Sequence, residues 1–245
     1  MLRALFLSVG ELPVSTCLDS LKSDVHQANL DLVSQGLVIL TWGNVSGIDR
    51  DTGIVAIKPS GVPYKELRPE DIVLVDLAGN ALEQGLRPSS DLATHLELYR
   101  HFPEIGGVAH THSHFATAFA QASREIPCFG TTHADHFYGA IPVTRDLRPG
   151  EMSDAYERNT GKVITELFAS DSAGAMPGAL VAHHGPFTWG TTPQDAVINS
   201  VVLEEVARLA QDTVVLSSAV APISQALLDR HFLRKHGPEA YYGQG

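Results

Sequence analysis

One stretch of the sequence leads from small and apolar residues straight into closely spaced histidines, Gly106-Gly107-Val108-Ala109-His110-Thr111-His112-Ser113-His114. In an extended strand alternate side chains share one face, so the imidazoles of His110 and His112 can converge on one point. This spacing is typical of metal ligands, because zinc readily takes neutral imidazole nitrogen. A polar strand edge would give the same pattern by chance, so further ligands are needed to decide.

A second short apolar run also ends in histidines, Ala179-Leu180-Val181-Ala182-His183-His184, and is followed by Gly185-Pro186. A catalytic zinc site has about three protein ligands and an open position for substrate. The second run is the best source of the third ligand, because it too is a short strand that ends in histidine. We therefore expect a metal site built from two strand ends.

The composition limits the partners of the chain. With 28 acidic and 17 basic residues, the formal net charge of −11 disfavours nucleic acid or an anionic membrane as the main partner. Cys17 and Cys128 are too few for a disulfide framework, which favours a reducing cytoplasm. The apolar runs fall short of the roughly 20 residues that a transmembrane helix needs.

We expect a leader of unknown role over residues 1–15 and a single domain over residues 16–245. The leader weakly resembles a signal peptide, but Glu11 and Pro13 interrupt it. Beyond it, segments with helical spacing alternate with short strand-like runs, without a linker or a repeat. This alternation predicts an α/β fold.

The first predicted elements are a helix over residues 16–35 and a buried strand over residues 37–40. Residues 41–47 are small and polar, so they predict a turn rather than a core strand. A hairpin signal at residues 49–53 then leads into a returning strand over residues 54–57.

Later elements include a strand over residues 72–75 and helices over residues 152–168, 192–209 and 227–233. Short apolar strands are also expected at Ile126 and at residues 141–143. Between them, residues 131–139 are rich in titratable groups and are expected to form a site wall. We interpret His95 and His101 as surface or packing residues of a helix that ends near Phe102.

Two predicted strand ends carry Asn44, Lys58, Ser60 and Gly61, whose lysine, hydroxyl and backbone amides suit a small phosphate monoester. A P-loop and a dinucleotide fingerprint are both missing from the sequence. Taken alone, these residues favour an ordinary pair of loops. Asp91 is placed to cap a helix, and it could instead reach a metal or a reacting proton.

Taken together, the motifs resemble the class II aldolase and epimerase family, and most closely its L-ribulose-5-phosphate 4-epimerases. The resemblance runs from about Leu37 to the end of the chain. The matching motifs are Thr41-Trp42-Gly43-Asn44-Val45-Ser46, Ile57-Lys58-Pro59-Ser60-Gly61, Pro88-Ser89-Ser90-Asp91, His110-Thr111-His112-Ser113, Gly130-Thr131-Thr132-His133-Ala134-Asp135, His184-Gly185-Pro186-Phe187, Lys235-His236-Gly237 and Tyr241-Tyr242-Gly243-Gln244.

The resemblance implies a mainly antiparallel central sheet covered by helices, and a cyclic homotetramer with active sites between subunits. It implies a zinc-like divalent ion held by His110, His112, His184 and Asp91, the last as a fourth ligand or a proton carrier. The implied phosphate-binding residues are Asn44, Lys58, Ser60, Gly61, Ser89 and Ser90. Three further catalytic residues, Asp135, His231 and Tyr242, would come from the neighbouring subunit.

The implied substrate is a small sugar phosphate, L-ribulose 5-phosphate, inverted at C4 to D-xylulose 5-phosphate. C4 lies β to the carbonyl, so its hydrogen is not acidic and simple deprotonation cannot invert it. Breaking and re-forming the C3–C4 bond can, with the metal ion as a Lewis acid for the charge that develops. This route needs acid/base groups on both faces of the released aldehyde, and we hypothesise that Asp135 and Tyr242 form the pair.

Several alternatives stay open on the sequence alone. Many relatives have His-Ser-His-Gly where this chain has Ala182-His183-His184-Gly185, so His184 is chosen by its place before Gly-Pro. A sugar-phosphate aldolase of the L-fuculose-1-phosphate type would share the site, although such aldolases resemble a pattern with Glu in place of Asp91. A thiosugar-phosphate dehydratase, a Schiff-base aldolase acting through Lys58, and a non-enzymatic adducin-like protein are more distant alternatives.

Overall fold

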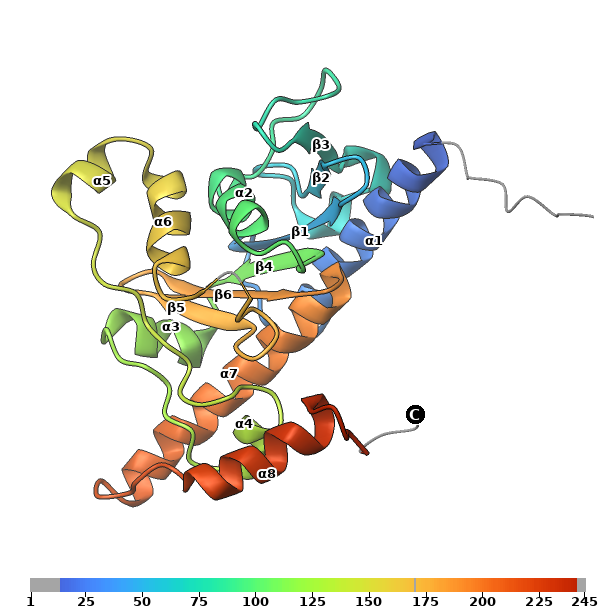
Figure 1. The fold of residues 1–245 in the computed structure, drawn as a ribbon. Coiled ribbons are helices and arrows are strands. Elements are labelled where there is room, and N and C mark those ends of the chain that lie inside the picture. Colours follow the sequence, from blue (N-terminus) through green and yellow to red (C-terminus); the bar gives the residue numbers. More distant parts are fainter. Residues whose placement is uncertain (1–13, 170, 242–245) are drawn as a thin grey trace, which may run out of the picture.

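The computed structural model describes residues 14–169 and 171–241, and its central feature is a six-stranded sheet (Figure 1). The strand order is β3-β2-β1-β4-β6-β5, and all neighbouring pairs are antiparallel. The strands are β1 (Gly43–Asp49), β2 (Ile54–Ile57), β3 (Val73–Asp76), β4 (Gly107–Thr111), β5 (Gly178–Val181) and β6 (Gly185–Gly190). The predicted α/β domain with a mainly antiparallel sheet is confirmed.

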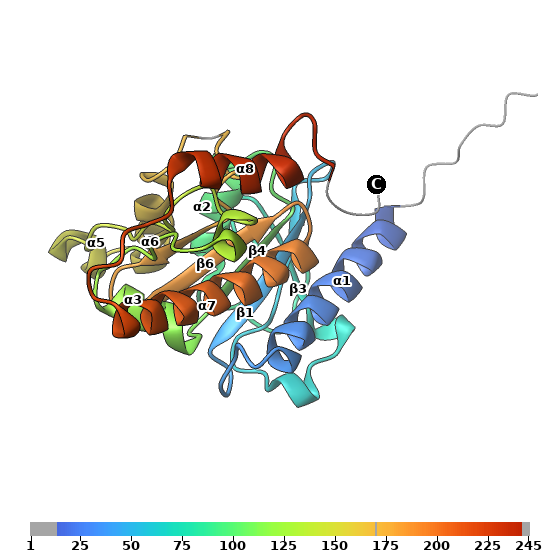
Figure 2. The ribbon, with the colours of Figure 1, turned by 90° about the horizontal axis from the view of Figure 1, so that it is seen from below.

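Helices cover both faces of this sheet. They are α1 (Val14–Ser34), α2 (Leu92–His101), α3 (His114–Gln121), α4 (Thr131–Ala134), α5 (Pro149–Ser153), α6 (Tyr156–Thr165), α7 (Pro193–Leu216) and α8 (Gln225–His236), with short 3-10 helices at Tyr64–Glu66 and Pro69–Asp71. Helices α1 and α7 contact β1 and β4 on one face, and Figure 2 shows both in front of the sheet. Helix α2, which packs against α6, covers the other face.

The alternation of side chains along β1 and β4 assigns a different task to each face of the sheet. Val45 and Ala109 lie in the apolar cluster that α1 and α7 complete. Ile48 and Val108 belong to the cluster on the α2 face. Because side chains alternate, Asn44, Ser46 and His110 also point to the α2 face. These three polar side chains are therefore gathered under α2.

The structure corrects the prediction for residues 37–47. Residues 37–40 do not form a strand, and residues 43–47, predicted as a turn, begin β1. Small residues are required there because α1 and α7 approach closely: a Cβ on Gly47 would lie 2.8 Å from Pro193 Cγ and 2.9 Å from Val25 Cγ2. The buried Ser46 is tolerated because its hydroxyl is hydrogen-bonded.

Other predicted elements are present at the expected positions but differ in length or regularity. The helix predicted over residues 152–168 is two helices, α5 and α6, separated where Ala155 takes a left-handed backbone at φ 52°. The strands expected at Ile126 and at residues 141–143 form only isolated bridges. Helix α7 runs to Leu216, farther than predicted, and its cap residue Thr192 accepts from the Asp195 amide as expected.

The described part of the chain begins within the segment expected as a leader. Residues 14 and 15 of the expected leader belong to α1, and residues 1–13 lie outside the described part. Within the described residues, none of the helices is long and apolar enough to cross a bilayer.

Candidate active site

Three histidine side chains converge where β4 ends and β5 turns into β6. His110 is in β4, His112 follows that strand, and His184 lies in the turn between Val181 and Gly185. Their ring centroids are 4.7, 4.9 and 5.0 Å apart, and the Nε2 atoms of His110 and His112 lie 3.1 Å from each other. The sequence therefore predicted correctly that these two segments come together.

The surroundings of His110 fix the orientation of its ring. Nδ1 lies 2.9 Å from the carbonyl oxygen of Pro186, to which it can donate, and the ring stacks on Phe187 with centroids 4.1 Å apart. With Nδ1 engaged by a carbonyl, Nε2 is left as the ligand atom. Sheet pairing sets this arrangement, because Asn44, His110 and Phe187 are partners across β1, β4 and β6.

The chemistry of the three imidazoles fits a divalent metal ion. One nitrogen from each residue lies within 4.8 Å of the others, and zinc holds imidazole nitrogens at about 2.0–2.1 Å. Burial lowers the pKa of His112 and brings the pKa of His184 to about 3, so both favour the neutral form that metals require. His184 Nδ1 is also buried without a partner among the described residues, as expected of a ligand.

Asp91 lies at the start of α2, but its side chain does not cap the helix in the described structure. Instead its Oδ2 accepts a hydrogen bond from Asn44 Nδ2 at 2.6 Å. Burial by itself would raise the pKa of this carboxyl, but His110, His95 and the Asn44 bond outweigh burial and hold it below its usual range. The carboxylate lines the same cleft as the histidines without belonging to their convergent group.

The six residues expected to bind phosphate all line one cleft of about 400 Å³ together with the histidines. Two loops form its wall, joined by hydrogen bonds from the Ser60 amide to Arg87 O and from the Ser89 amide to Lys58 O. The lining residues are Thr41, Trp42, Gly43, Asn44, Lys58, Pro59, Ser60, Gly61, Ser89, Ser90, Asp91, His110, His112 and His184. Donors that suit an anion thus line the same cavity as three histidines that could hold a metal ion.

Lys58 is the cation of this wall. Its ammonium donates to Val62 O at 2.7 Å and lies 4.7 Å from the centre of the Tyr64 ring. Burial lowers the pKa of this lysine to about 8, because water no longer stabilises its charge. Near neutral pH the side chain is still mostly charged, and the cleft carries a positive group at the loop wall.

Asp135 and His231 lie together but away from this cleft. Asp135 Oδ1 is 3.0 Å from His231 Nδ1, and Arg234 Nη2 donates to Asp135 Oδ2 at 2.7 Å. Burial pushes the pKa of Asp135 upward, but Arg234, His231 and Lys235 hold it below its usual range. The described lining of the metal cleft includes neither Asp135 nor His231, and Tyr242 lies outside the described residues.

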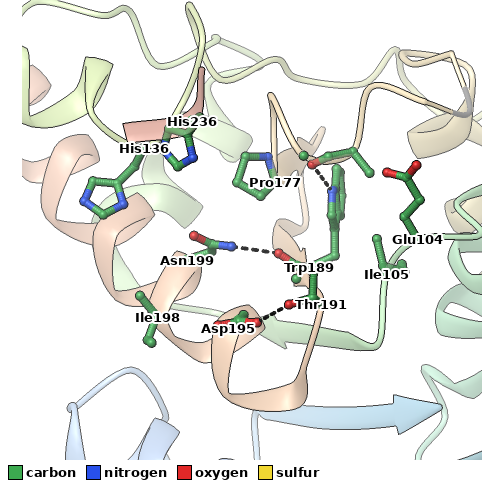
Figure 3. A pocket seen from close by; sticks show the side chains of 13 residues that line it. Glu104, Ile105, His136, Pro177, Trp189, Thr191, Asp195, Ile198, Asn199 and His236 are labelled. Atoms are coloured by element: carbon green, nitrogen blue, oxygen red, sulfur yellow. Dashed lines mark hydrogen bonds between the residues drawn. The ribbon is translucent and has the colours of Figure 1, made fainter. Parts of the chain in front are cut away.

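A second cleft of about 430 Å³ is lined by His136, the neighbour of Asp135 in sequence, and by residues of β6 and α7 (Figure 3). His136 and His236 lie on one side of it, and His236 Nε2 is 2.9 Å from Asp135 O. Asn199 donates to Trp189 O at 2.8 Å in its wall, which joins α7 to β6. The metal cleft and this second cleft share no described lining residue.

Sequence reasoning missed the polar residues beneath Asp91. His95, interpreted as a surface or packing residue, is fully buried and hydrogen-bonded through Nδ1 to Ser46 Oγ at 2.7 Å. A signal was available, because His95 follows Asp91 by four residues and so shares its helix face. His183 does not belong to the group of three histidines. Its Nε2 lies 3.3 Å from Asp146 Oδ1 on the surface.

Comparisons with known proteins show the family of this chain and support its fold. The chain belongs to the Class II Aldolase and Adducin N-terminal domain family, whose model matches residues 23–211. L-ribulose-5-phosphate 4-epimerase UlaF of Salmonella paratyphi C (strain RKS4594) is 53% identical over 227 residues, which cover 93% of this chain and 100% of that protein.

Solved structures show the same fold at lower identity. An L-fuculose 1-phosphate aldolase is similar with a TM-score of 0.72 and 24% identity, over 85% of this chain and 92% of that one. The L-fuculose 1-phosphate aldolase from Glaciozyma antarctica PI12 has a TM-score of 0.73 and 18% identity, over 96% of this chain and 88% of its own. At these identities the likeness establishes the architecture alone.

Proposed function

We propose that this protein is a metal-dependent L-ribulose-5-phosphate 4-epimerase, which inverts C4 to give D-xylulose 5-phosphate. The observation that carries the proposal is the 53% identity to an epimerase of that name over the whole length of that relative. The cleft supports it independently, because metal ligands and anion donors face the same cavity.

In this proposal the loop wall of the cleft holds the substrate phosphate. Lys58 supplies the charge, and the hydroxyls and amides of Ser60, Gly61, Ser89 and Ser90 supply donors, with Asn44 beside them. The phosphate would keep the two-carbon aldehyde in the cleft after the C3–C4 bond breaks. Retention of this fragment is what distinguishes an epimerase from an aldolase.

His110, His112 and His184 would hold the divalent ion, with Asp91 as a further ligand or a proton carrier. We propose zinc because all three nearby donors are imidazoles. The bound ion supplies Lewis-acid stabilisation of the negative charge that develops on the substrate oxygens. The hydrogen bond from His110 Nδ1 to the Pro186 carbonyl would leave Nε2 available to hold the ion.

Asp135, His231 and Tyr242 would act as the acid/base group of a neighbouring subunit. The proposal is supported by the described lining of the metal cleft, which contains neither Asp135 nor His231, whereas His136 and His236 line the second cleft. A head-to-tail contact that brings the two clefts of neighbouring copies together forms a ring when its rotation closes. This is the proposed homotetramer, and the free thiols of Cys17 and Cys128 suit the cytoplasmic location we propose for it.

The test is conversion of L-ribulose 5-phosphate to D-xylulose 5-phosphate by purified protein, before and after chelation and with zinc restored. We expect conversion that chelation abolishes and zinc restores, without release of free glycolaldehyde phosphate. Net release of the aldehyde would instead identify an aldolase. Activity that survives chelation, together with a Schiff base that borohydride traps, would identify an enzyme acting through Lys58.

A further inference from the structure

A buried chain of hydrogen bonds runs beneath the metal cleft, from α2 to β1 and back. The Tyr99 hydroxyl lies 2.8 Å from Ser46 Oγ, which in turn lies 2.7 Å from His95 Nδ1. The three residues are at most 1% exposed. Fully buried polar side chains are uncommon, and those that occur are nearly always hydrogen-bonded.

The direction of each hydrogen bond in this chain determines which nitrogen of His95 carries the hydrogen. Burial raises the pKa of Tyr99, so its hydroxyl is protonated and can donate to Ser46 Oγ. Ser46 has one hydroxyl hydrogen, which is then free to point at His95 Nδ1. A neutral imidazole that accepts at Nδ1 carries its hydrogen on Nε2.

The His95 Nε2 atom is buried and has no hydrogen-bond partner among the described residues. Asp91 stands one helical turn earlier on the same face of α2. Burial lowers the pKa of His95, and the negative charge of Asp91 opposes that shift. A carboxylate attracts an N–H and repels a nitrogen lone pair. The alternative tautomer, with a bare Nε2 near Asp91, is therefore disfavoured.

Two parallel connections join β1 to the start of α2. Asn44 donates to Asp91, and two residues farther along the same face Ser46 contacts His95. The Phe187 ring contacts His95 edge-on at 6.0 Å and stacks on His110 at 4.1 Å. His95 thus lies in the wall that supports both Asp91 and a metal-site histidine.

From this arrangement we propose that His95 is a positioning residue, which presents its Nε2–H to Asp91 and orients that carboxylate toward the metal ion. The role depends on the proposed metal chemistry of the cleft. Tyr99 and Ser46 serve it by fixing the tautomer of His95. Outer-sphere partners of this kind typically change metal affinity about 10–100-fold when removed.

The experiment compares zinc affinity, by competition with a chromophoric chelator, in the wild type and in His95→Phe, His95→Gln and Ser46→Ala. We expect about 10–100-fold weaker zinc binding in His95→Phe. His95→Gln, whose amide can donate from near the Nε2 position, should recover much of the loss. Ser46→Ala should weaken zinc in the same direction, and it carries the test if His95→Phe does not fold.

The matched control is Thr94→Val, which removes a part-buried hydrogen bond from the same helix to Glu157 O of α6. It should lower thermal stability while leaving zinc affinity unchanged. Equal losses of zinc affinity in Thr94→Val and His95→Phe would reduce His95 to a structural residue.

A double-mutant cycle tests whether His95 acts through Asp91. In an Asp91→Ala background, His95→Phe should weaken zinc no further, because the carboxylate it positions is gone. Fully additive losses would overturn the proposal. Zinc affinity is measured without substrate, so a wild type inactive on L-ribulose 5-phosphate would refute the proposed reaction while leaving this result intact.

Discussion

At the scale of single residues, burial of Lys58 opposes the charge that its proposed role in phosphate binding requires. The lysine must be charged to attract a phosphate, yet burial lowers its pKa to about 8. Its Nζ makes hydrogen bonds to the carbonyls of Pro59 and Val62 rather than an ion pair. The charge of the proposed phosphate wall is therefore sensitive to mildly alkaline pH.

This gives a pH prediction with a definite sign. Because the pKa of Lys58 is depressed, its charge is present below about pH 8 and is lost above it. We expect kcat/KM for the sugar phosphate to fall as pH rises through that value, by up to about tenfold per unit. Lys58→Met should lower kcat/KM throughout and remove this alkaline limb. An unchanged limb in the variant would assign the titration to another group.

His183 and His184 provide a second residue-scale prediction, because adjacent histidines have different surroundings. His184 belongs to the convergent histidine group, whereas His183 is near Asp146 on the surface. His184→Ala should weaken zinc binding by more than the roughly 10–100-fold typical of an outer-sphere loss. His183→Ala is its matched control and should bind zinc as the wild type does. The chelator competition described above measures both, and a reversed order would exchange their roles.

At the scale of elements, β1 shows what sequence patterns can and cannot provide. The histidines were predictable because a strand ending in alternating ligands is a local pattern. Asn44 and Ser46 were assigned to a turn, because their suitability for a core strand depends on long-range partners. Those partners, Asp91 and His95, lie 47 and 49 residues away in the chain. The location of Asp135 outside the cleft was likewise set by tertiary packing with α8.

Gly47 tests the close approach of α1 and α7 to β1. A methyl group there would lie 2.8 Å from Pro193 Cγ, so packing must shift to admit it. We expect Gly47→Ala to lower the free energy of unfolding by about 1–3 kcal/mol, measured from the midpoint of urea denaturation. Gly85→Ala, where a Cβ would meet nothing within 4 Å, is the control. Equal midpoints for the two variants would contradict the packing argument.

At the scale of the whole molecule, the separation of the two clefts gives a prediction about shared sites. His110→Ala damages the metal cleft, and Asp135→Asn damages the acid/base group. If each active site combines these groups from neighbouring copies, co-expression of both variants should restore about a quarter of wild-type activity, because one random pairing in four is intact on both sides.

The control pairs His110→Ala with Lys58→Met, two variants damaged in the same cleft. Neighbouring copies then never provide an intact metal cleft, so activity should not exceed that of Lys58→Met alone. Activity per site is measured on protein purified as mixed oligomers, with the ratio of the two chains determined by mass spectrometry. Mixed oligomers of His110→Ala and Asp135→Asn that remain inactive would place a complete site within one chain.

The pairing of β1 with β4 has a consequence for folding. Asn44 lies opposite His110 in this register. A slip of one residue would turn His110 toward α1 and α7 and disperse the ligands. An ion that binds only the correctly paired sheet adds its binding free energy to that pairing and to no misaligned one. The bound ion would then stabilise only chains whose strands are correctly aligned, before any substrate binds.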